Sequence, residues 1–168
     1  MEITIRDYRD DDHKSCLALY GELSQYYADI YGDSAIADGD SSRWLESLRK
    51  SNEYYGTWVA EADGEVVGLA GMLTNGEEGR IEPVIVSSSY RNNGIGTRLV
   101  RHVSEVAKGK NIRFLSIQPT ARNERALSLY VRLGFNMLGH VELFQDLSTE
   151  STRQWKSGIE IHGHKLDY

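Results

Sequence analysis

Residues 91–97, with the sequence RNNGIGT, place the narrowest limits on the fold of this chain. They follow an apolar run at 84–86 that is typical of a strand, and they lead into a helical pattern in which Ile95, Leu99 and Val103 share one face. A strand, a tight turn with two glycines and a helix can together bind an anion. The first helical turn has N–H groups without intrahelical partners and carries the positive end of the helix dipole. The segment therefore predicts a phosphate site at the start of this helix.

Single positions exclude two common phosphate motifs. A dinucleotide-binding fingerprint needs a further glycine where this chain has Leu99, and a P-loop needs Gly-Lys-Ser/Thr where Gly96 is followed by Thr97 and Arg98. The order Arg-x-x-Gly-x-Gly after a strand instead resembles the pyrophosphate loop of the GNAT superfamily of N-acetyltransferases, which binds acetyl-coenzyme A.

A second segment, residues 123–135, strengthens this resemblance. Asn123 is a good helix N-cap, the residues after it form an apolar stripe, and Gly134 suits a left-handed helix end. The second GNAT signature likewise has an asparagine at a helix start, a tyrosine seven residues later, here Tyr130, and a helix end at Leu-Gly-Phe. Two motifs in this order, with room between them for one helix and one strand, make a strong signal. The resemblance covers roughly residues 57–140, and the flanks only loosely.

Composition sets broader limits. At 168 residues, without a linker-like stretch, the chain is expected to form one GNAT-like domain over residues 1–168. No apolar run approaches the ~18 residues of a membrane span, and the N-terminus lacks a basic and then apolar export signal. The single cysteine, Cys16, lies in a helical apolar pattern and is expected to be buried rather than catalytic. We therefore expect a cytoplasmic protein with no membrane partner.

The net charge of −6 is unevenly distributed. Residues 80–132 hold 10 basic and 3 acidic side chains, a net charge of +7 around the predicted phosphate loop. This charge fits an anionic cofactor that bears a pyrophosphate and a ribose phosphate. Nucleic acid is the competing interpretation, but aromatic residues are scarce between these cations and the whole chain is acidic, so no nucleic-acid partner is expected.

Apolar patterns and turn residues predict the order of the elements. Asp63-Gly64 and Asn75-Gly76 are hairpin signals. The patterns favour an α/β (α+β) fold, and the resemblance implies a mixed, mostly antiparallel twisted sheet that splays between two central parallel strands, with helices on both faces. Strands are expected near 3–8, 57–62, 65–73, 80–86 and 112–117, with a closing pair at 137–147 and 159–166, and helices around 16–30, 44–48, 95–108 and 123–133.

Pro83 interrupts the strand before the loop, because proline has no N–H for sheet pairing. In the GNAT family this strand carries a bulge and separates from its parallel neighbour, and the pantetheine arm of the cofactor pairs with its backbone. Residues 84–86 can also be a buried strand and Asn123 a plain cap, and both roles are compatible with cofactor binding. The resemblance implies that acetyl-CoA is bound along its pantetheine by Val84, Ile85 and Val86, around its pyrophosphate by Arg91, Asn92, Asn93, Gly94, Ile95, Gly96 and Thr97, and also by Asn123 and Tyr130.

Acetyl transfer from a thioester to an amine needs a base for the ammonium proton and an acid for the leaving thiolate. The resemblance implies that Tyr130 is the general acid, the alternative being a core tyrosine. Some peptide-acetylating members carry a glutamate where this chain has Gln118, which cannot accept a proton. Glu82, on the strand with the bulge, is the better candidate for the base, acting directly or through a water. The alternative for Glu82 is an exposed or ion-paired carboxylate.

The acceptor is expected to be the amine of a small molecule or a peptide. Aspartates without an intervening cation (Asp29, Asp33, Asp38, Asp40) accompany tyrosines in the region that usually selects the substrate in this family, which favours a cationic amine. A solvated acidic loop is the alternative. No metal is expected, because the histidines lack ligand spacing, and homodimers are frequent in the family although no segment here marks an interface.

The sequence as a whole predicts an acetyl-CoA-dependent N-acetyltransferase that uses a ternary complex. A non-catalytic acyl-CoA-binding domain, supported by Gln118, remains the alternative from another class. A hydrolase is disfavoured, since no serine or cysteine nucleophile pairs with a histidine.

Overall fold

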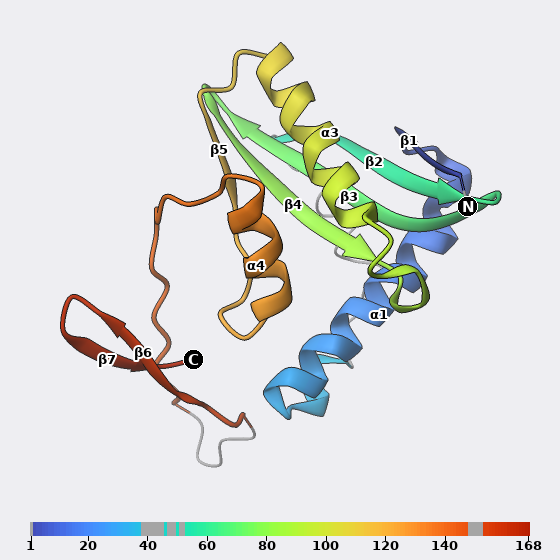
Figure 1. The fold of residues 1–168 in the computed structure, drawn as a ribbon. Coiled ribbons are helices and arrows are strands. Elements are labelled where there is room, and N and C mark those ends of the chain that lie inside the picture. Colours follow the sequence, from blue (N-terminus) through green and yellow to red (C-terminus); the bar gives the residue numbers. More distant parts are fainter. Residues whose placement is uncertain (1, 38–45, 47–49, 51–52, 148–152) are drawn as a thin grey trace. The chain divides into compact units, whose positions relative to one another are not determined.

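The computed structural model describes residues 2–37, 46, 50, 53–147 and 153–168 (Figure 1). The expected helix with Trp44, Leu45 and Leu48 lies outside the described residues. Contacts between Cα atoms divide the chain into two compact units. The first comprises Met1–Leu23 and Asp40–Gln118, and the second comprises Ser24–Gly39 and Pro119–Tyr168.

A five-stranded sheet forms the framework of the first unit. The order is β1-β2-β3-β4-β5, in which the first three pairings are antiparallel and the last, between β4 and β5, is parallel. This arrangement confirms the predicted mixed, mostly antiparallel sheet. The strands are β1 (Ile3–Asp7), β2 (Tyr54–Ala62), β3 (Glu65–Asn75), β4 (Glu78–Val86) and β5 (Phe114–Ile117).

The tight turns of the sheet lie where their residues predict them. Asp63 and Gly64 both have positive φ, 50° and 83°, which is the twist that a two-residue hairpin between β2 and β3 requires. At the other end of β3, Gly76 has φ 62° in the turn to β4. These two hairpins make β2, β3 and β4 consecutive neighbours and thereby fix their order in the sheet.

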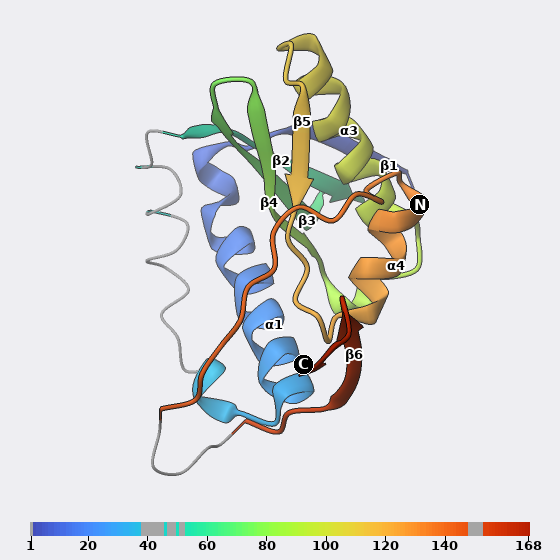
Figure 2. The same cartoon turned by 90° about the vertical axis from the view of Figure 1, so that its left-hand side faces the viewer.

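Two helices cover opposite faces of this sheet. The first part of α1 (His13–Tyr31) buries Cys16, Leu19 and Tyr20 against Val59, Leu69 and Ile85 of the strands. On the other face, α3 (Ile95–Gly109) buries an apolar stripe that includes Leu99 and Val103. Figure 2 shows the sheet between these two helical elements. The apolar spacings of both helices were correctly read from the sequence.

An ion pair fixes the start of α1. The preceding 3-10 turn, Asp10–Asp12, places the Asp12 carboxylate within 2.7 Å and 2.9 Å of the guanidinium nitrogens of Arg6. Asp12 also accepts a hydrogen bond from the N–H of Arg9 at 2.7 Å. Because Asp12 is only 6% exposed, these partners compensate the burial of its charge.

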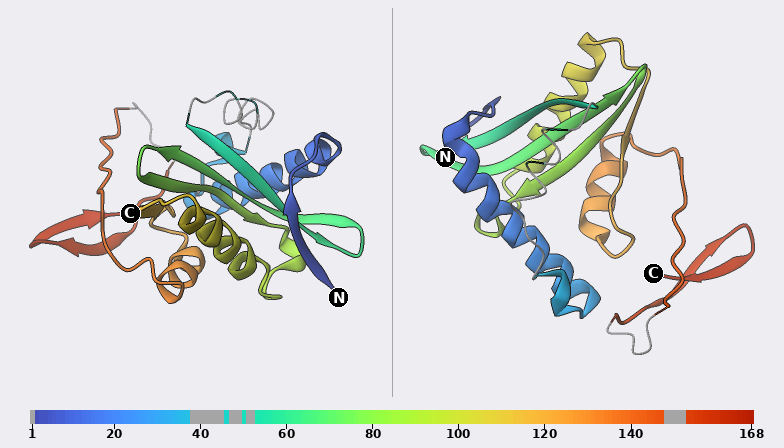
Figure 3. Two further views of the ribbon diagram at one scale, coloured as in Figure 1. Left: turned by 90° about the horizontal axis from the view of Figure 1, so that it is seen from above. Right: turned by 180° about the vertical axis from the view of Figure 1, so that it is seen from behind.

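The second unit is built from short elements. Asp33 caps a 3-10 turn at Ser34–Ile36, and the buried Arg122 donates to the carbonyl oxygens of Ile30 and Tyr168, both at 2.8 Å. The structured elements are the last part of α1, helix α4 (Glu124–Arg132) and a two-stranded sheet of β6 (Ser157–Ile161) and β7 (His164–Asp167), drawn in red in Figure 3.

The predicted closing strand pair is wrong. Residues 137–147 form no strand, and their apolar side chains are exposed, Met137 by 85% and Leu147 by 83%. Positive φ at His162 and Gly163 instead makes a turn inside the segment expected to be one strand, so that β6 pairs with β7. Closing so short a loop costs less entropy than bringing two distant segments together, and local pairing prevails. Among the described residues, no helix has the length and apolar character to cross a membrane.

Candidate functional site

The pairing between β4 and β5 covers only the first part of β4. Residues 78–81 are in register with β5, which ends at Ile117. Beyond Ile81, residues 82–86 of β4 lie beside β3, and in the described part of the chain no strand pairs with their other edge. Figure 1 shows β4 and β5 starting together and diverging. The predicted splay is confirmed, and it leaves backbone groups to which an extended ligand can hydrogen-bond.

A bulge lies at the point where the two strands separate. The register between β3 and β4 shifts between Ala70 and Met72, so that Glu82 and Pro83 together lie opposite Gly71. A Cβ on Gly71 would collide with the carbonyl oxygen of Glu82, so the backbones are in close approach there. The interruption predicted from Pro83 is therefore present.

Residues 84–86 combine a packed face with an open edge. Ile85 is 2% exposed and belongs to the core cluster with Leu69, whereas Val84 and Val86 are half-buried. The two interpretations raised from the sequence, a buried strand and a ligand-pairing strand, are thus compatible in this structure. Side chains supply the packing, and the backbone edge remains for a ligand.

Glu82 has a half-exposed side chain beside a guanidinium. Its Oε2 lies 2.8 Å from Nε of Arg80, with the two side chains 40% and 38% exposed, although this nitrogen does not meet hydrogen-bond geometry. The Glu82 carboxylate thus faces the positive charge of Arg80. The ion-paired state considered from the sequence is the one observed. Gln118, which directly follows β5, is exposed.

The glycine turn leaves the start of α3 uncapped. Asn92 and Gly94 have φ of 68° and 75°, and Gly94, the N-cap, brings no side chain to the helix end. The first intrahelical bond runs from the N–H of Arg98 to the carbonyl of Gly94 at 3.0 Å. The N–H groups of the three preceding helical residues therefore point out of the helix end, as an anion requires.

Side-chain contacts hold this turn. The amide of Asn93 donates to the carbonyl oxygens of Tyr90 and Arg91 at 3.1 Å and 3.3 Å, and Nε of Arg91 donates to the carbonyl of Val86 at 3.2 Å. Ile95 is buried at 1% exposure, whereas Gly96 and Thr97 are half-buried. Of the predicted loop residues, Asn93 and Ile95 thus shape the turn, and residues 94–97 supply the helix end.

In the second unit, Asn123 caps α4. Its Oδ1 accepts a hydrogen bond from the N–H of Ala126 at 3.1 Å and another from the hydroxyl of Tyr26 at 3.3 Å. The predicted cap is confirmed, and so is the helix end, where Gly134 has φ 98°. Asn123 is thus held by a tyrosine that sequence reasoning did not connect with it.

Tyr130 is the buried side chain of α4, with 8% exposure. Its ring meets that of Phe135 edge-on, with centroids 6.3 Å apart. Burial raises the pKa of Tyr130 well above its usual value, and the nearby Tyr27 raises it further. A phenol is protonated at neutral pH with or without this shift, and the raised pKa makes Tyr130 a weaker acid than an exposed tyrosine. Other apolar residues of the predicted stripe, Leu127 and Val131, are about half exposed.

The predicted site residues are divided between the two units. Glu82, residues 84–86 and residues 91–97 belong to the first, and Asn123 and Tyr130 belong to the second. Among the described residues no cluster of histidine, cysteine or carboxylate side chains could hold a metal ion. His102, one of the histidines that lack ligand spacing, packs edge-on against Trp58 with ring centroids 5.6 Å apart.

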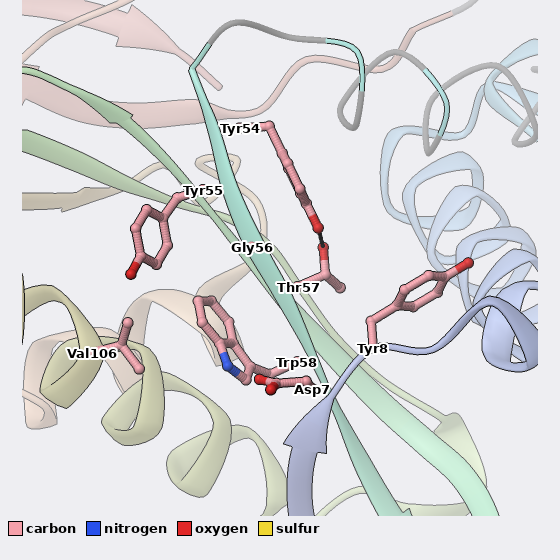
Figure 4. Close-up of a pocket in the computed structure, with 8 residues that line it drawn as sticks. All are labelled: Asp7, Tyr8, Tyr54, Tyr55, Gly56, Thr57, Trp58 and Val106. Atoms are coloured by element: carbon pink, nitrogen blue, oxygen red, sulfur yellow. Dashed lines mark hydrogen bonds between the residues drawn. The ribbon is translucent and has the colours of Figure 1, made fainter.

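An open hollow in the first unit involves none of these motif residues. It measures about 440 Å³ and lies where β2 extends past the end of β1, beside the second half of α3 (Figure 4). Its wall includes Trp58 stacked on Tyr55 at 6.3 Å. In the sequence, the pair of tyrosines before Gly56 was the signal that could have pointed to this hollow. The lining residues are Asp7, Tyr8, Tyr54, Tyr55, Gly56, Thr57, Trp58 and Val106.

A split sheet, a bulge and an uncapped helix end together make a geometry that an extended, phosphate-bearing ligand can fit. The model of the acetyltransferase (GNAT) family matches residues 16–135 of the chain. The chain belongs to this family.

Individual relatives agree with this assignment. The probable N-acetyltransferase camello of Xenopus tropicalis is 30% identical over 146 residues, which are 81% of this chain and 66% of the relative. Streptothricin acetyltransferase of Streptomyces lavendulae is 32% identical over 125 residues, 72% of this chain and 64% of the relative. The chain thus spans less than two thirds of the length of either protein.

Solved structures show the same fold. The PaiA N-acetyltransferase of Thermoplasma acidophilum, in complex with coenzyme A, superimposes with a TM-score of 0.70 at 20% identity, covering 80% of this chain and 89% of that one. The ribosomal-protein-S18-alanine N-acetyltransferase of Escherichia coli gives a TM-score of 0.65 at 19% identity, with 82% and 80% covered.

Proposed function

We propose that residues 1–168 act as one domain that transfers the acetyl group of acetyl-CoA to a primary amine in a ternary complex. The observation that carries this proposal is the separation of β4 from β5 at residue 82, together with the glycine turn at the start of α3, the next helix of the chain longer than a 3-10 turn. Membership of the GNAT family supports the same activity.

The first unit offers groups that fit the pantetheine arm and the pyrophosphate of coenzyme A. The free edge of residues 84–86 suits the amide-bearing pantetheine arm, because an extended arm can pair with a strand as another strand would. The N–H groups at residues 95–97 suit the pyrophosphate, because the helix end favours negative charge. Arg91 and Asn92 adjoin this end, and Asn123 is proposed to contact the cofactor arm.

Two side chains are proposed to move the protons. Glu82, directly or through a water, accepts the proton of the ammonium group, and the freed amine forms the new C–N bond. Tyr130 donates its phenolic proton to the sulfur as the C–S bond breaks, and the second proton that the nitrogen loses as the amide forms restores the Tyr130 phenol. Bound acetyl-CoA supplies the acetyl group as a thioester. The place of Tyr130 in the GNAT-like segment 123–135 supports this assignment, whereas its raised pKa by itself opposes proton donation.

The acceptor is proposed to be a small-molecule or peptide amine. Relatives carry names of both kinds, such as the L-methionine sulfoximine/L-methionine sulfone acetyltransferase of Pseudomonas aeruginosa and the putative ribosomal protein bS18-alanine N-acetyltransferase of Bacillus subtilis. A cationic amine is favoured by Asp29 and the tyrosines of α1, as argued from the sequence.

The test is an assay of thiol release from acetyl-CoA with a panel of amines, using polyamines, aminoglycosides and peptides with free N-termini. We expect at least one amine to give release that depends on enzyme and amine, with one acetylated product per thiol. Binding of acetyl-CoA without release for any amine would contradict the enzymatic proposal.

The pairing of Glu82 with Arg80 favours a second candidate, a non-catalytic acyl-CoA-binding domain. In that case the base is absent, Gln118 being unable to replace it, and the cleft serves only to bind the ligand. The variant Glu82→Gln separates the two candidates. Its expected loss of thiol release with unchanged coenzyme A affinity supports the enzyme, whereas a wild-type protein as inactive as the variant supports the binding domain.

A further inference from the structure

Glu22 of α1 contacts the backbone directly after β4. Its Oε1 accepts a hydrogen bond from the hydroxyl of Ser87 at 3.0 Å, and its Oε2 accepts one from the N–H of Ser88 at 2.6 Å. Ser87 is the N-cap of the 3-10 turn Ser88–Tyr90, but its own side chain does not cap that turn. Glu22 therefore supplies the cap from a helix 65 residues earlier in the chain.

This 3-10 turn is the first link in the chain of contacts that ends at the cofactor loop. The N–H of Ser87 donates to the carbonyl of Val67 at 2.9 Å, and the N–H of Tyr90 donates to the carbonyl of Ser87 at 2.9 Å. The carbonyl of Tyr90 in turn accepts from the amide of Asn93, next to Gly94. The position of Ser87 and Ser88 thus sets where the glycine turn begins.

The charge of Glu22 does not by itself favour this position. Burial alone would raise the pKa of Glu22, but hydrogen bonds from Ser88 and Ser87, with help from the charge of Arg91, lower it below its usual range. The group is ionised at neutral pH, and an anion beside a phosphate-binding loop opposes phosphate by Coulomb repulsion. Its hydrogen bonds, rather than its charge, would have to account for any gain in binding.

We propose that Glu22 is a positioning residue for the pyrophosphate loop, which it holds in the binding conformation through Ser87 and Ser88. This inference rests on the proposed function, because the ligand is coenzyme A. Glu22 touches no reacting atom, and its effect is on cofactor affinity. Its two properties have opposite effects. Loss of the hydrogen bonds weakens binding, and the accompanying loss of the charge offsets only part of that weakening.

The test compares variants by coenzyme A binding in calorimetry and by steady-state kinetics. For Glu22→Ala we expect the Kd of coenzyme A and the KM of acetyl-CoA to rise about tenfold, with kcat at saturation within about twofold, because two charge-assisted hydrogen bonds are lost. Glu22→Gln keeps one acceptor, and we expect its Kd and KM to rise about threefold. For Ser87→Ala, which leaves the charge in place, we expect both constants to rise about twofold.

Glu105→Gln is the matched control, since Glu105 is an exposed residue of α3 paired with Lys108 and lies in the same unit. It removes one negative charge without touching the turn, and we expect an unchanged Kd. Equal or tighter binding in Glu22→Ala overturns the proposal. If Glu22→Ala does not fold, the other two variants decide the question. Kd values of Glu22→Gln and Ser87→Ala above that of wild type support the proposal, and values equal to or below it overturn the proposal.

A ligand-free measurement keeps this inference separate from the proposed function. Amide hydrogen exchange of Ser88 should be slow in wild type and at least about tenfold faster in Glu22→Ala, because the N–H loses its acceptor. Wild-type protein that binds no coenzyme A contradicts the proposed function. Wild-type protein that binds, together with a Glu22→Ala variant unchanged in both binding and exchange, contradicts only the role of Glu22.

Discussion

The hydroxyl of Tyr26 donates a hydrogen bond to Oδ1 of Asn123 at 3.3 Å, joining residues 97 positions apart. The same oxygen accepts the N–H of Ala126, so two donors determine which end of the amide faces α4. The Nδ2 group is thereby left to donate elsewhere. Tyr26 is therefore expected to matter for the proposed cofactor contact of Asn123, although it is absent from both signature motifs.

We predict that Tyr26→Phe raises the KM of acetyl-CoA by about two- to tenfold, the range that one neutral hydrogen bond accounts for. The free energy of unfolding should change little, because Oδ1 of Asn123 still accepts the N–H of Ala126 and caps α4. Steady-state kinetics with urea unfolding checks this. Tyr54→Phe is the control, since it removes a comparable bond at 3.4 Å to Thr57 in the first unit. A KM equal to that of the control would refute the prediction.

Tyr130→Phe should abolish most of the activity while sparing the fold. The loss of a general acid is expected to lower kcat by about 100-fold or more, while the affinity for coenzyme A changes by less than about threefold. Thiol-release kinetics and calorimetry measure the two quantities. A variant with wild-type kcat would show that the phenol is a core side chain only.

The thiol of Cys16 should be inert in the folded protein. It is fully buried, and burial raises its pKa to about 12, so the thiolate fraction at pH 8 is on the order of 10⁻⁴. We expect no reaction with Ellman's reagent within minutes for native protein and one equivalent in urea, because the chain contains one cysteine. Rapid labelling of native protein is the contrary outcome.

Gly71→Ala should destabilise the first unit by about 1–3 kcal/mol, because its Cβ would collide with backbone at the bulge, which cannot rotate away as a side chain can. Gly109→Ala is the control, since a Cβ at Gly109 meets no atom within 4 Å. Urea unfolding of both variants tests this. Equal stability of the two variants would show that the bulge can relax.

The ion pair of Asp12 and Arg6 predicts a dependence of stability on pH. The hydrogen bond from Arg6 lowers the pKa of Asp12 below its ordinary value of 3.8. A lowered pKa stabilises the folded state above the ordinary value, and that stabilisation is lost as the pH falls through the folded-state pKa. Asp12→Asn should therefore cost about 3 kcal/mol at neutral pH, a cost that narrows as acid protonates the wild-type carboxylate.

Urea unfolding between pH 2 and pH 7, which spans the pKa range, provides the measurement. Asp11→Asn serves as the control, because Asp11 is exposed and adjacent in sequence. A stability difference for Asp12→Asn that is the same at the lowest and highest pH would exclude the ion pair as its origin.

Local signals predicted most of the first unit. The turn residues Asp63 and Gly64, the interruption at Pro83 and the glycine turn before Ile95 each require a particular backbone, and each was found where expected. Such features depend on a few adjacent residues. Sequence alone is sufficient for them because the chemistry that decides them lies within one or two turns of chain.

Features that depend on distant partners were missed. The apolar pattern of residues 137–147 suggested a strand, but a strand needs an edge to pair with, and periodicity does not identify that edge. The contacts of Glu22 and Tyr26 were also missed, because their partners lie 65 and 97 residues away. For Glu82, the sequence identified the strand and raised an ion pair as an alternative, but it did not identify Arg80 as the partner.

The free edge of β4 beyond Ile81 has a consequence for handling the protein. A row of unsatisfied strand donors and acceptors is a template for intermolecular sheet formation as well as for a ligand. Concentrated protein without coenzyme A should therefore associate and precipitate sooner than protein saturated with it, since the ligand would complete the sheet. The free edge of β4, which is proposed to bind the cofactor, would then also determine how readily the protein aggregates in solution.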